Sequence, residues 1–204
     1  MELVSLAEFM PEQSDGAIGK RFESLAIRER PVTIVAFYTQ FARVDLHPYV
    51  EIDRQYTHVR CNAADVSPCV LCDLGDPRKT YYVTPVYAVA DAAVRALVIS
   101  DAHTPHSLGP RYKDELSKGN LDKRFLCISR VAAKYTTTSL PAREGQEMGE
   151  RVIKKFLEDL QAGRIRLDDA IARYSNEALL EIDSIRRDAE ARGLDCLRYS
   201  AQAR

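Results

Sequence analysis

The first two thirds of the chain carry short runs of β-branched and aromatic residues, separated by polar stretches rich in proline and glycine. Such runs are typical of β-strands. One is Pro31-Val-Thr-Ile-Val-Ala-Phe-Tyr38, and residues 80–89 and 93–100 pair naturally as a hairpin around Ala90-Asp91. Pro85 is expected to interrupt the first strand of that hairpin. The predicted strands lie at 31–38, 55–61, 80–89, 93–100, 125–130 and 133–139, with a short helix at 107–118.

From about Arg143 onward the pattern changes to apolar residues at helical spacing. Gly163 divides them into two groups, as a glycine after a helix does. Asp168 and Asp169 stand near the start of the second group, where the helix dipole favours acids. The apolar positions are Met148, Val152, Phe156 and Leu160, followed by Leu167, Ile171, Leu179, Ile182 and Ile185. We therefore expect a helical hairpin within residues 143–204.

These elements predict an α+β protein in three parts. Residues 1–30 form an N-terminal helical arm and connector, with an amphipathic helix over residues 2–10. Residues 31–142 form a small, irregular antiparallel β-barrel interrupted by one helix and one metal-binding loop. Residues 143–204 form the helical hairpin and a C-terminal tail, and the hairpin is expected to pack on the barrel or on a partner subunit.

Composition favours an intracellular protein. Of its 204 residues 46% are hydrophobic, which is enough for the core of one or two domains. The chain has no secretory hydrophobic segment, and no apolar run approaches the roughly 20 residues of a membrane span. Its five cysteines are an odd number with three clustered, which fits metal binding and free thiols in a reducing compartment. We expect a cytoplasmic protein that does not enter membranes.

The strongest chemical signal is a cluster of three cysteines: Cys61, Cys69 and Cys72. A tight turn framed by Pro68 and Gly75 can direct both thiolates of the C-x2-C pair at one ion, with Gly75 at positive φ. One imidazole would complete a closed tetrahedral Cys3His shell for Zn2+, which is structural because no position is open for catalysis. The alternative of buried reduced thiols suits Cys127, in its apolar run, better than this polar context. A redox role is disfavoured because loops flank the pair on both sides.

The fourth ligand has several candidates among the histidines. His58 lies three residues before Cys61 on a predicted strand, so the two side chains project to opposite faces. His47 lies one loop further back, in a segment that can fold back onto the cysteines, and we prefer it. His103 and His106 are a third possibility, although a histidine pair in a polar segment is more often a solvated loop.

Charge is distributed unevenly although the net charge is only −1. Between Arg78 and Lys134 the chain has ten basic and five acidic residues. This bias follows the cysteine cluster directly and is permissive for a polyanionic partner.

The chain contains a series of short motifs in a characteristic order. They are Arg60-Cys61, Ser67-Pro-Cys69-Val-Leu-Cys72-Asp-Leu-Gly75, Thr80-Tyr-Tyr-Val83, Ala96-Leu-Val-Ile-Ser100, Phe125-Leu-Cys-Ile-Ser-Arg130 and a Lys-Tyr-Thr segment. This order, over roughly residues 30–140, resembles the zinc-containing single-stranded-DNA-binding proteins of the T-even bacteriophage type. The resemblance implies an OB-fold core with an inserted zinc subdomain, held by one upstream histidine and three cysteines. The order His47, Cys61, Cys69, Cys72 matches that set.

The chain departs from the family in its tail. Family members commonly end in an acidic tail that recruits replication partners, whereas residues 186–204 are mixed to basic. Single-strand binding in recombination, transposition, or phage or plasmid maintenance therefore fits as well as a role in DNA replication.

Binding of single strands requires aromatic side chains for base stacking beside cations for phosphate contact. Tyr81 and Tyr82 face opposite ways in a strand, so one of them is expected in the core. Charged residues that flank strands, such as Arg78 and Arg130, are not explained by packing. The predicted nucleic-acid contacts are Arg78, Lys79, Tyr81, Tyr82, Arg111, Tyr112, Arg130, Lys134 and Tyr135.

No motif of an enzyme accompanies this pattern. The sequence lacks G-x4-G-K-[ST], G-x-G-x2-G, H-E-x2-H and G-x-S-x-G. The predicted function is largely sequence-independent binding of single-stranded DNA with one structural zinc, and an RNA ligand fits the same pattern. The alternative hypothesis is a zinc-stapled adaptor whose helical hairpin binds a protein partner or a second copy, without nucleic acid.

Overall fold

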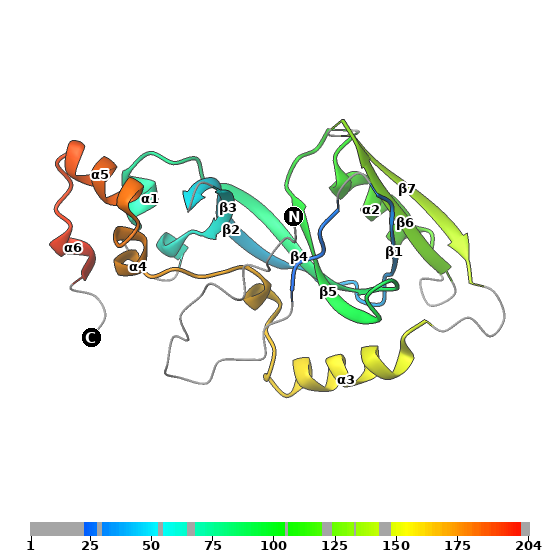
Figure 1. The fold of residues 1–204 in the computed structure, drawn as a ribbon. Coiled ribbons are helices and arrows are strands. Elements are labelled where there is room, and N and C mark those ends of the chain that lie inside the picture. The colour runs from blue at the N-terminus through cyan, green and yellow to red at the C-terminus, as the bar shows by residue number, and fades with distance from the viewer. Residues whose placement is uncertain are drawn as a thin grey trace, which may run out of the picture.

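A computed structural model of the chain describes residues 23–27, 30–52, 55–64, 68–104, 106–119, 124–132, 134–142 and 148–200. These residues form an α+β fold with a seven-stranded, mostly antiparallel sheet and several helices (Figure 1). The strands are β1 (Val32–Val35), β2 (Ala42–Ile52), β3 (Gln55–Arg60), β4 (Lys79–Ala88), β5 (Ala93–Ser100), β6 (Arg124–Val131) and β7 (Lys134–Pro141). Each predicted strand is observed, and β2 is an additional one. The predicted N-terminal helix over residues 2–10 lies outside the described residues.

The long strand β4 organises the sheet. On one edge it pairs with β5 from Tyr81 to Ala88, as the predicted hairpin requires. On the other edge its first half pairs with β2 and its last residues pair with β1. The full order is β3-β2-β4-β1-β6-β7, with β5 on the far side of β4.

Pro85 lies inside β4 and does not interrupt it, contrary to the sequence prediction. It stands opposite Ala96 of β5. On the other edge, pairing with β2 ends at Val83 and pairing with β1 begins at Tyr87. A proline cannot donate a backbone hydrogen bond, and here it occupies the point where β4 passes from one neighbour to the next.

Two apolar layers cover the two faces of the sheet. On one face the helix α2 (Leu108–Ser117) buries Leu108 and Tyr112 against Ile34, Leu126 and Ile128 of β1 and β6. On the other face the helix α3 (Glu150–Gln161) buries Phe156 with side chains of β2, β4 and β5. Alternation along β4 explains this division, because Tyr81 and Val83 face α3 whereas Tyr82 and Val86 face α2.

A third apolar cluster lies at the far end of β2 and β3. It joins the short helix α1 (Val70–Asp73) to three C-terminal helices: α4 (Asn176–Leu180), α5 (Asp183–Ala191) and α6 (Leu197–Ser200). Its fully buried members include Val59, Val70, Leu71, Leu179 and Ala189. Figure 1 shows these helices gathered at one end of the molecule, away from α2 and α3.

The predicted helical hairpin within residues 143–204 is therefore wrong. Gly163, at φ +69°, ends α3 as predicted, but the chain then continues through a 3-10 turn (η4, Leu167–Ala170) to a different surface. The helix α3 packs on the sheet, and α4 and α5 pack on α1. Helical spacing identified apolar faces correctly but carried no information about which surface each face would cover.

In the part of the chain that the structure describes, no helix has the length and apolar character needed to cross a membrane.

The start of α3 depends on a glycine in contact with the sheet. Gly149 has φ +73°, and an added Cβ would lie 2.4 Å from the ring of Tyr87. Gly163, at the other end of α3, has a similar φ of +69° but open space around it. We predict that Gly163→Ala lowers the free energy of unfolding by about 1–2 kcal/mol through backbone strain alone. Gly149→Ala should lower it by a further 1–3 kcal/mol or so through overpacking.

Urea denaturation of the two variants and of wild type measures this difference. Equal losses in both variants would show that α3 does not depend on its contact with Tyr87.

Candidate metal centre and nucleic-acid surface

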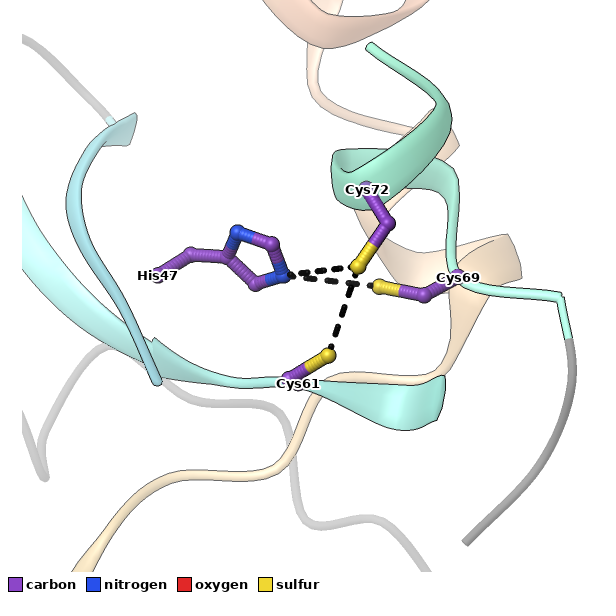
Figure 2. A group of neighbouring side chains, drawn as sticks. All are labelled: His47, Cys61, Cys69 and Cys72. Carbon is purple, nitrogen blue, oxygen red and sulfur yellow. Dashed lines mark hydrogen bonds between the residues drawn. The ribbon is translucent and has the colours of Figure 1, made fainter. Parts of the chain in front are cut away.

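Four side chains from three segments converge at the end of the molecule that carries α1 (Figure 2). His47 comes from β2, Cys61 from the end of β3, and Cys69 and Cys72 from the start of α1. Their ligand atoms all lie within 4.8 Å of one another. The group can hold a metal ion, and it contains the four residues that the sequence predicted.

Strand register explains why His47, and not His58, belongs to this group. His47 pairs with Val59 across β2 and β3, so the two side chains share a face, and Cys61 follows two residues later. His58 projects to the other face, where its ring meets Tyr81 edge-on with centroids 5.4 Å apart. His58 and Cys61 therefore project to opposite faces of β3, as the sequence predicted.

The expected surroundings of His47 were wrong. It was assigned to a loop, but it lies inside β2, and the β2–β3 register shifts between His47 and Val50. Pro48 lies in that interval, and because proline has no backbone N–H, the irregularity is placed where the ladder loses a donor.

The C-x2-C pair occupies one turn of helix instead of the expected tight turn. Cys69 is the residue before α1 and Cys72 lies within it, so a single helical turn brings both sulfurs to the same side. Gly75 has φ +73° and its N–H donates to the carbonyl of Cys72. The positive φ predicted at Gly75 is observed, and it ends α1 directly after the second cysteine.

Three distances within the group match the edges of a tetrahedral metal shell. His47 Nε2 lies 3.6 Å from the sulfurs of both Cys69 and Cys72, and the sulfurs of Cys61 and Cys72 are 3.5 Å apart. Zinc bonds to sulfur at about 2.3 Å and to imidazole at about 2.0 Å, so the edges of its tetrahedron measure about 3.5–3.8 Å. Cys61, Cys69 and His47 are also buried, as a closed structural site requires.

Without a cation among them, the thiols of the cluster oppose one another's ionisation. Burial raises the pKa of the Cys69 thiol, but hydrogen bonds from His47 and from the backbone of Cys72 and Asn62 lower it to about 6. Burial and the neighbouring sulfurs of Cys61 and Cys69 raise the pKa of the Cys72 thiol to about 12. Cys69 therefore ionises easily, whereas ionisation of Cys72 beside it costs free energy. A bound divalent cation would remove this conflict by neutralising the sulfurs.

Asn176 ties the C-terminal helices to the metal loop. Its side-chain oxygen accepts hydrogen bonds from the backbone N–H of Val70 and the side chain of Asn62, and its amide donates to the carbonyl of Pro68. A second tie joins the Tyr199 hydroxyl to the Asp73 carboxylate at 2.6 Å. Sequence reasoning missed Asn176, because a polar residue on a helix gives no local sign that it is buried.

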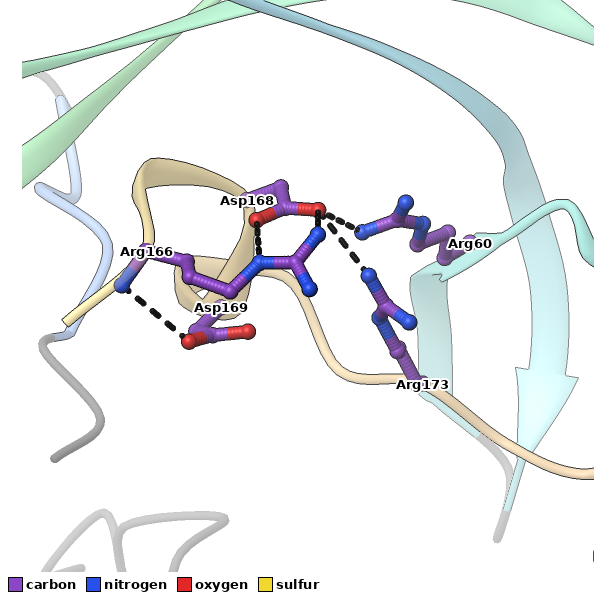
Figure 3. A network of polar contacts seen from close by, with 5 residues as sticks. All are labelled: Arg60, Arg166, Asp168, Asp169 and Arg173. Carbon is purple, nitrogen blue, oxygen red and sulfur yellow. Dashed lines mark hydrogen bonds and ion pairs between the residues drawn. The ribbon is translucent and has the colours of Figure 1, made fainter. Parts of the chain in front are cut away.

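A second polar network lies beside the cluster (Figure 3). The carboxylate of Asp168 accepts hydrogen bonds from Arg60, Arg166 and Arg173, with Nη2 of Arg173 at 2.9 Å. The network ties η4 to β3, directly before Cys61. The sequence predicts Asp168 at the start of a helix, where the helix dipole would stabilise it. In the structure its carboxylate instead pairs with Arg60 and Arg173, which lie outside η4.

The predicted nucleic-acid contacts do not lie on one surface. Tyr81 and Tyr112 are buried, 9% and 1% exposed, so these two predictions are wrong: both rings are core side chains. Burial also raises the pKa of the Tyr112 hydroxyl. Tyr82, Arg111 and Tyr135 are partly buried. The exposed members are Arg78, Lys79, Arg130 and Lys134.

Two of these cations rest on tyrosine rings. The Lys79 ammonium lies 5.4 Å from the ring centroid of Tyr49, and the Arg130 guanidinium lies 5.5 Å from that of Tyr135. Arg78 instead faces Asp45 at 4.0 Å, and its interaction with the thiol of Cys61 raises the pKa of the guanidinium, which places it beside the metal cluster.

Sequence reasoning missed two exposed aromatic residues. Tyr49 and Tyr56 are 64% and 74% exposed. They alternate with buried Val50 and half-buried Thr57 on β2 and β3. The alternation is visible in the sequence, but the loop predicted around Tyr49 gave no reason to expect an exposed strand face there.

Comparison with protein-family models, with curated proteins and with solved structures found no match. The resemblance to the phage zinc proteins therefore stays a prediction from sequence.

Removal of the metal should release the C-terminal helices, because α4–α6 pack on the helix that carries two ligands. We predict about one zinc per purified chain, and loss of that zinc in Cys69→Ser. The variant should lose more than about 4 kcal/mol of stability, as loss of a structural metal does. Elemental analysis and urea denaturation measure both effects, and limited proteolysis should show new cleavage within residues 174–200.

Cys127→Ser is the matched control, since Cys127 lies on β6 outside the cluster. Metal-free wild-type protein with unchanged stability and unchanged proteolysis would contradict the prediction.

The pKa of Asp168 gives a second prediction. Partial burial raises the pKa of this carboxyl, but Arg60 and Arg166 outweigh it and lower the pKa to about 2 from an ordinary value of 3.8. Asp168→Asn should therefore cost about 2 kcal/mol of unfolding free energy at neutral pH. Because the folded pKa is the lower one, this stabilisation is present above about pH 4 and declines as the pH falls toward 2.

Urea denaturation at several pH values measures the difference between wild type and variant. Asp183→Asn is the control, because Asp183 forms an exposed ion pair with Arg186 and should contribute under about 1 kcal/mol. Equal losses in the two variants would refute the assigned role of Asp168.

Proposed function

We propose that this protein binds single-stranded nucleic acid, in the first instance DNA, on the outer face of the β2–β3 hairpin, and that one structural zinc braces that hairpin. Binding is largely independent of sequence and involves no catalysis. One observation carries the proposal: exposed aromatic rings and a lysine gather on a single strand face beside the metal cluster.

The surface stripe consists of Tyr49, Tyr56, His58 and Lys79. His58 contacts Tyr81 of β4, and Lys79 projects from β4 on the same side as Tyr81 because the two are separated by one residue. Lys79 lies over Tyr49, and Tyr56 shares the face of His58 on β3. The stripe thus spans three adjacent strands.

Its composition suits single strands better than duplex. Exposed tyrosine rings can stack on unpaired bases, and each stack contributes about 1–3 kcal/mol irrespective of base identity. The bases of a duplex are already stacked and do not offer their faces. Lys79 stands where a backbone phosphate would lie next to a base stacked on Tyr49. Glu51, which pairs with Tyr56, is an acidic group close to the stripe.

The zinc has a mechanical role in this proposal. His47 belongs to one strand of the hairpin and Cys61 directly follows the other, so one ion joins the base of both strands to α1. A two-stranded hairpin is only marginally stable alone. Cross-linking it to the third apolar cluster would hold the stripe rigid and lower the entropy lost on binding.

The fold relation is part of the same proposal. OB-fold proteins bind oligonucleotides on a strand face and its adjoining loops. The stripe occupies a comparable strand face, and α2 packs on the opposite face of the described sheet. These features support treating the core as an OB-like barrel with the metal loop inserted between β3 and β4.

The adaptor hypothesis loses its main support. It placed partner binding on the helical hairpin predicted within residues 143–204. The apolar sides of α4 and α5 are instead buried within the protein, and Leu179 and Ala189 are both fully covered.

Binding should depend on the stripe in two separable ways. We predict that Tyr49→Ala and Tyr56→Ala each weaken binding of oligothymidine by roughly 5- to 100-fold, with little change in salt dependence. Lys79→Gln should make the slope of log affinity against log salt shallower by about 0.7, the value for one phosphate contact on a single strand. Fluorescence anisotropy of a labelled oligonucleotide across a salt series measures both quantities.

Lys155→Gln is the charge-matched control, because Lys155 is exposed on α3, away from the stripe. No binding of wild-type protein to oligothymidine at low salt, or equal affinity for duplex, would overturn the proposed function.

A further inference from the structure

Three arginines gather at the end of β3, close to the surface stripe (Figure 3). Arg60 is the last residue of β3, Arg166 directly precedes η4, and Arg173 follows it. All three side chains donate hydrogen bonds to the carboxylate of Asp168. Asp169 lies in the same group, where its carboxylate accepts from the backbone N–H of Arg166 at 3.2 Å. We call these five residues the Asp168 network.

Strand alternation places the network on the same sheet face as the stripe. Tyr56, His58 and Arg60 are alternate residues of β3, so their side chains project to one face. The two ends of this row are about 13 Å apart along the strand. Across the sheet, Arg60 pairs with Leu46 of β2, and Leu46 pairs with Lys79 of β4. The network therefore continues the stripe past His58.

The segment around η4 is fixed to this face by contacts of its own. Ile171 is buried in the apolar cluster that joins α3 to the sheet. The backbone N–H of Arg60 donates to the carbonyl of Ala172 at 3.4 Å. These contacts hold the backbone that carries Arg166 and Arg173 beside the end of β3.

The network is buried on its inner side and open on its outer side. The side chains of Arg60 and Asp168 are only 10% and 13% exposed, whereas those of Arg166 and Arg173 are 63% and 41% exposed. The shared carboxylate thus keeps two solvent-facing guanidinium groups close to each other. A guanidinium has five N–H donors in a planar fork, so one side chain can hold a carboxylate and a phosphate together.

The charge of the network favours an anionic ligand. Three arginines accompany two aspartates, so the five residues have an excess of one positive charge. Arg60 alone would neutralise the buried carboxylate of Asp168, so stability does not require two further arginines at the surface. Exposed arginines next to exposed tyrosine rings match the alternating phosphates and bases of a nucleic-acid strand.

We propose that Arg166 and Arg173 form a phosphate-binding site for the backbone of a bound single strand. The strand runs along β3, from a base stacked on Tyr56 to phosphates at these two arginines. This inference rests on the proposed function and extends it, because it gives the strand a path and adds contacts beyond the stripe.

Salt dependence tests the site. Arg166→Gln and Arg173→Gln should each make the slope of log affinity for oligothymidine against log salt shallower by about 0.7, and the double variant by about 1.4. Arg166→Lys should keep most of the wild-type slope, because it keeps the charge. Fluorescence anisotropy of labelled oligothymidine across a salt series measures the slopes, and urea denaturation checks that each variant is folded.

Arg164→Gln is the matched control. Arg164 lies two residues before Arg166 and its side chain is 60% exposed, but it pairs with Asp159 outside the network. This variant should keep the wild-type slope. Equal changes in slope for Arg164→Gln and Arg166→Gln would show a general effect of protein charge and would overturn the site.

The outcomes separate this inference from the proposed function. If Tyr56→Ala weakens binding while Arg166→Gln and Arg173→Gln keep the wild-type slope, the phosphate site is overturned and the proposed function stands. If the arginine variants change the slope while Tyr49→Ala and Tyr56→Ala bind as wild type does, the phosphate site stands and the stacking role of the stripe is overturned. If wild-type protein does not bind oligothymidine at low salt, both are overturned.

Discussion

The convergence of three thiols and one imidazole is the constraint on which the rest of this structure depends. Within a group 4.8 Å across, one cysteine ionises easily and its neighbour resists ionisation, with pKa values of about 6 and 12. Only a bound cation makes all the sulfurs favourable as thiolates together. The same ion would join a β-hairpin to a one-turn helix that is too short to be stable alone.

The C-terminal helices follow from this constraint. They cover the apolar side of α1, and Asn176 satisfies two backbone groups at the start of the segment that carries Cys69 and Cys72, the carbonyl of Pro68 and the N–H of Val70. The metal cluster, the C-terminal helices and the end of the β2–β3 hairpin therefore form one cooperative unit. The opposite end of the sheet, with α2, has its own apolar core.

Much of the local structure was predictable because it depends on short-range chemistry. The hairpin of β4 and β5, the helix α2, the end of α3 at Gly163 and the strands β6 and β7 all follow from residue type and periodicity. The four members of the His47–Cys61–Cys69–Cys72 cluster were also predictable, since C-x2-C spacing and strand alternation act over a few residues. The errors at Pro85, at the loop assigned to His47 and at the helical hairpin share one cause. In each, a partner distant in sequence decided the outcome.

The sequence by itself determined which residues could be ligands, where the strands other than β2 lie, and that His58 must face away from Cys61. Tertiary structure alone decided that Tyr81 and Tyr112 are core side chains, that Tyr49 and Tyr56 are exposed, and that α3 and α4 cover different surfaces. The physical reason is the range of the forces involved. Backbone geometry and alternation act between neighbours along the chain, whereas burial depends on which distant segment packs against a side chain.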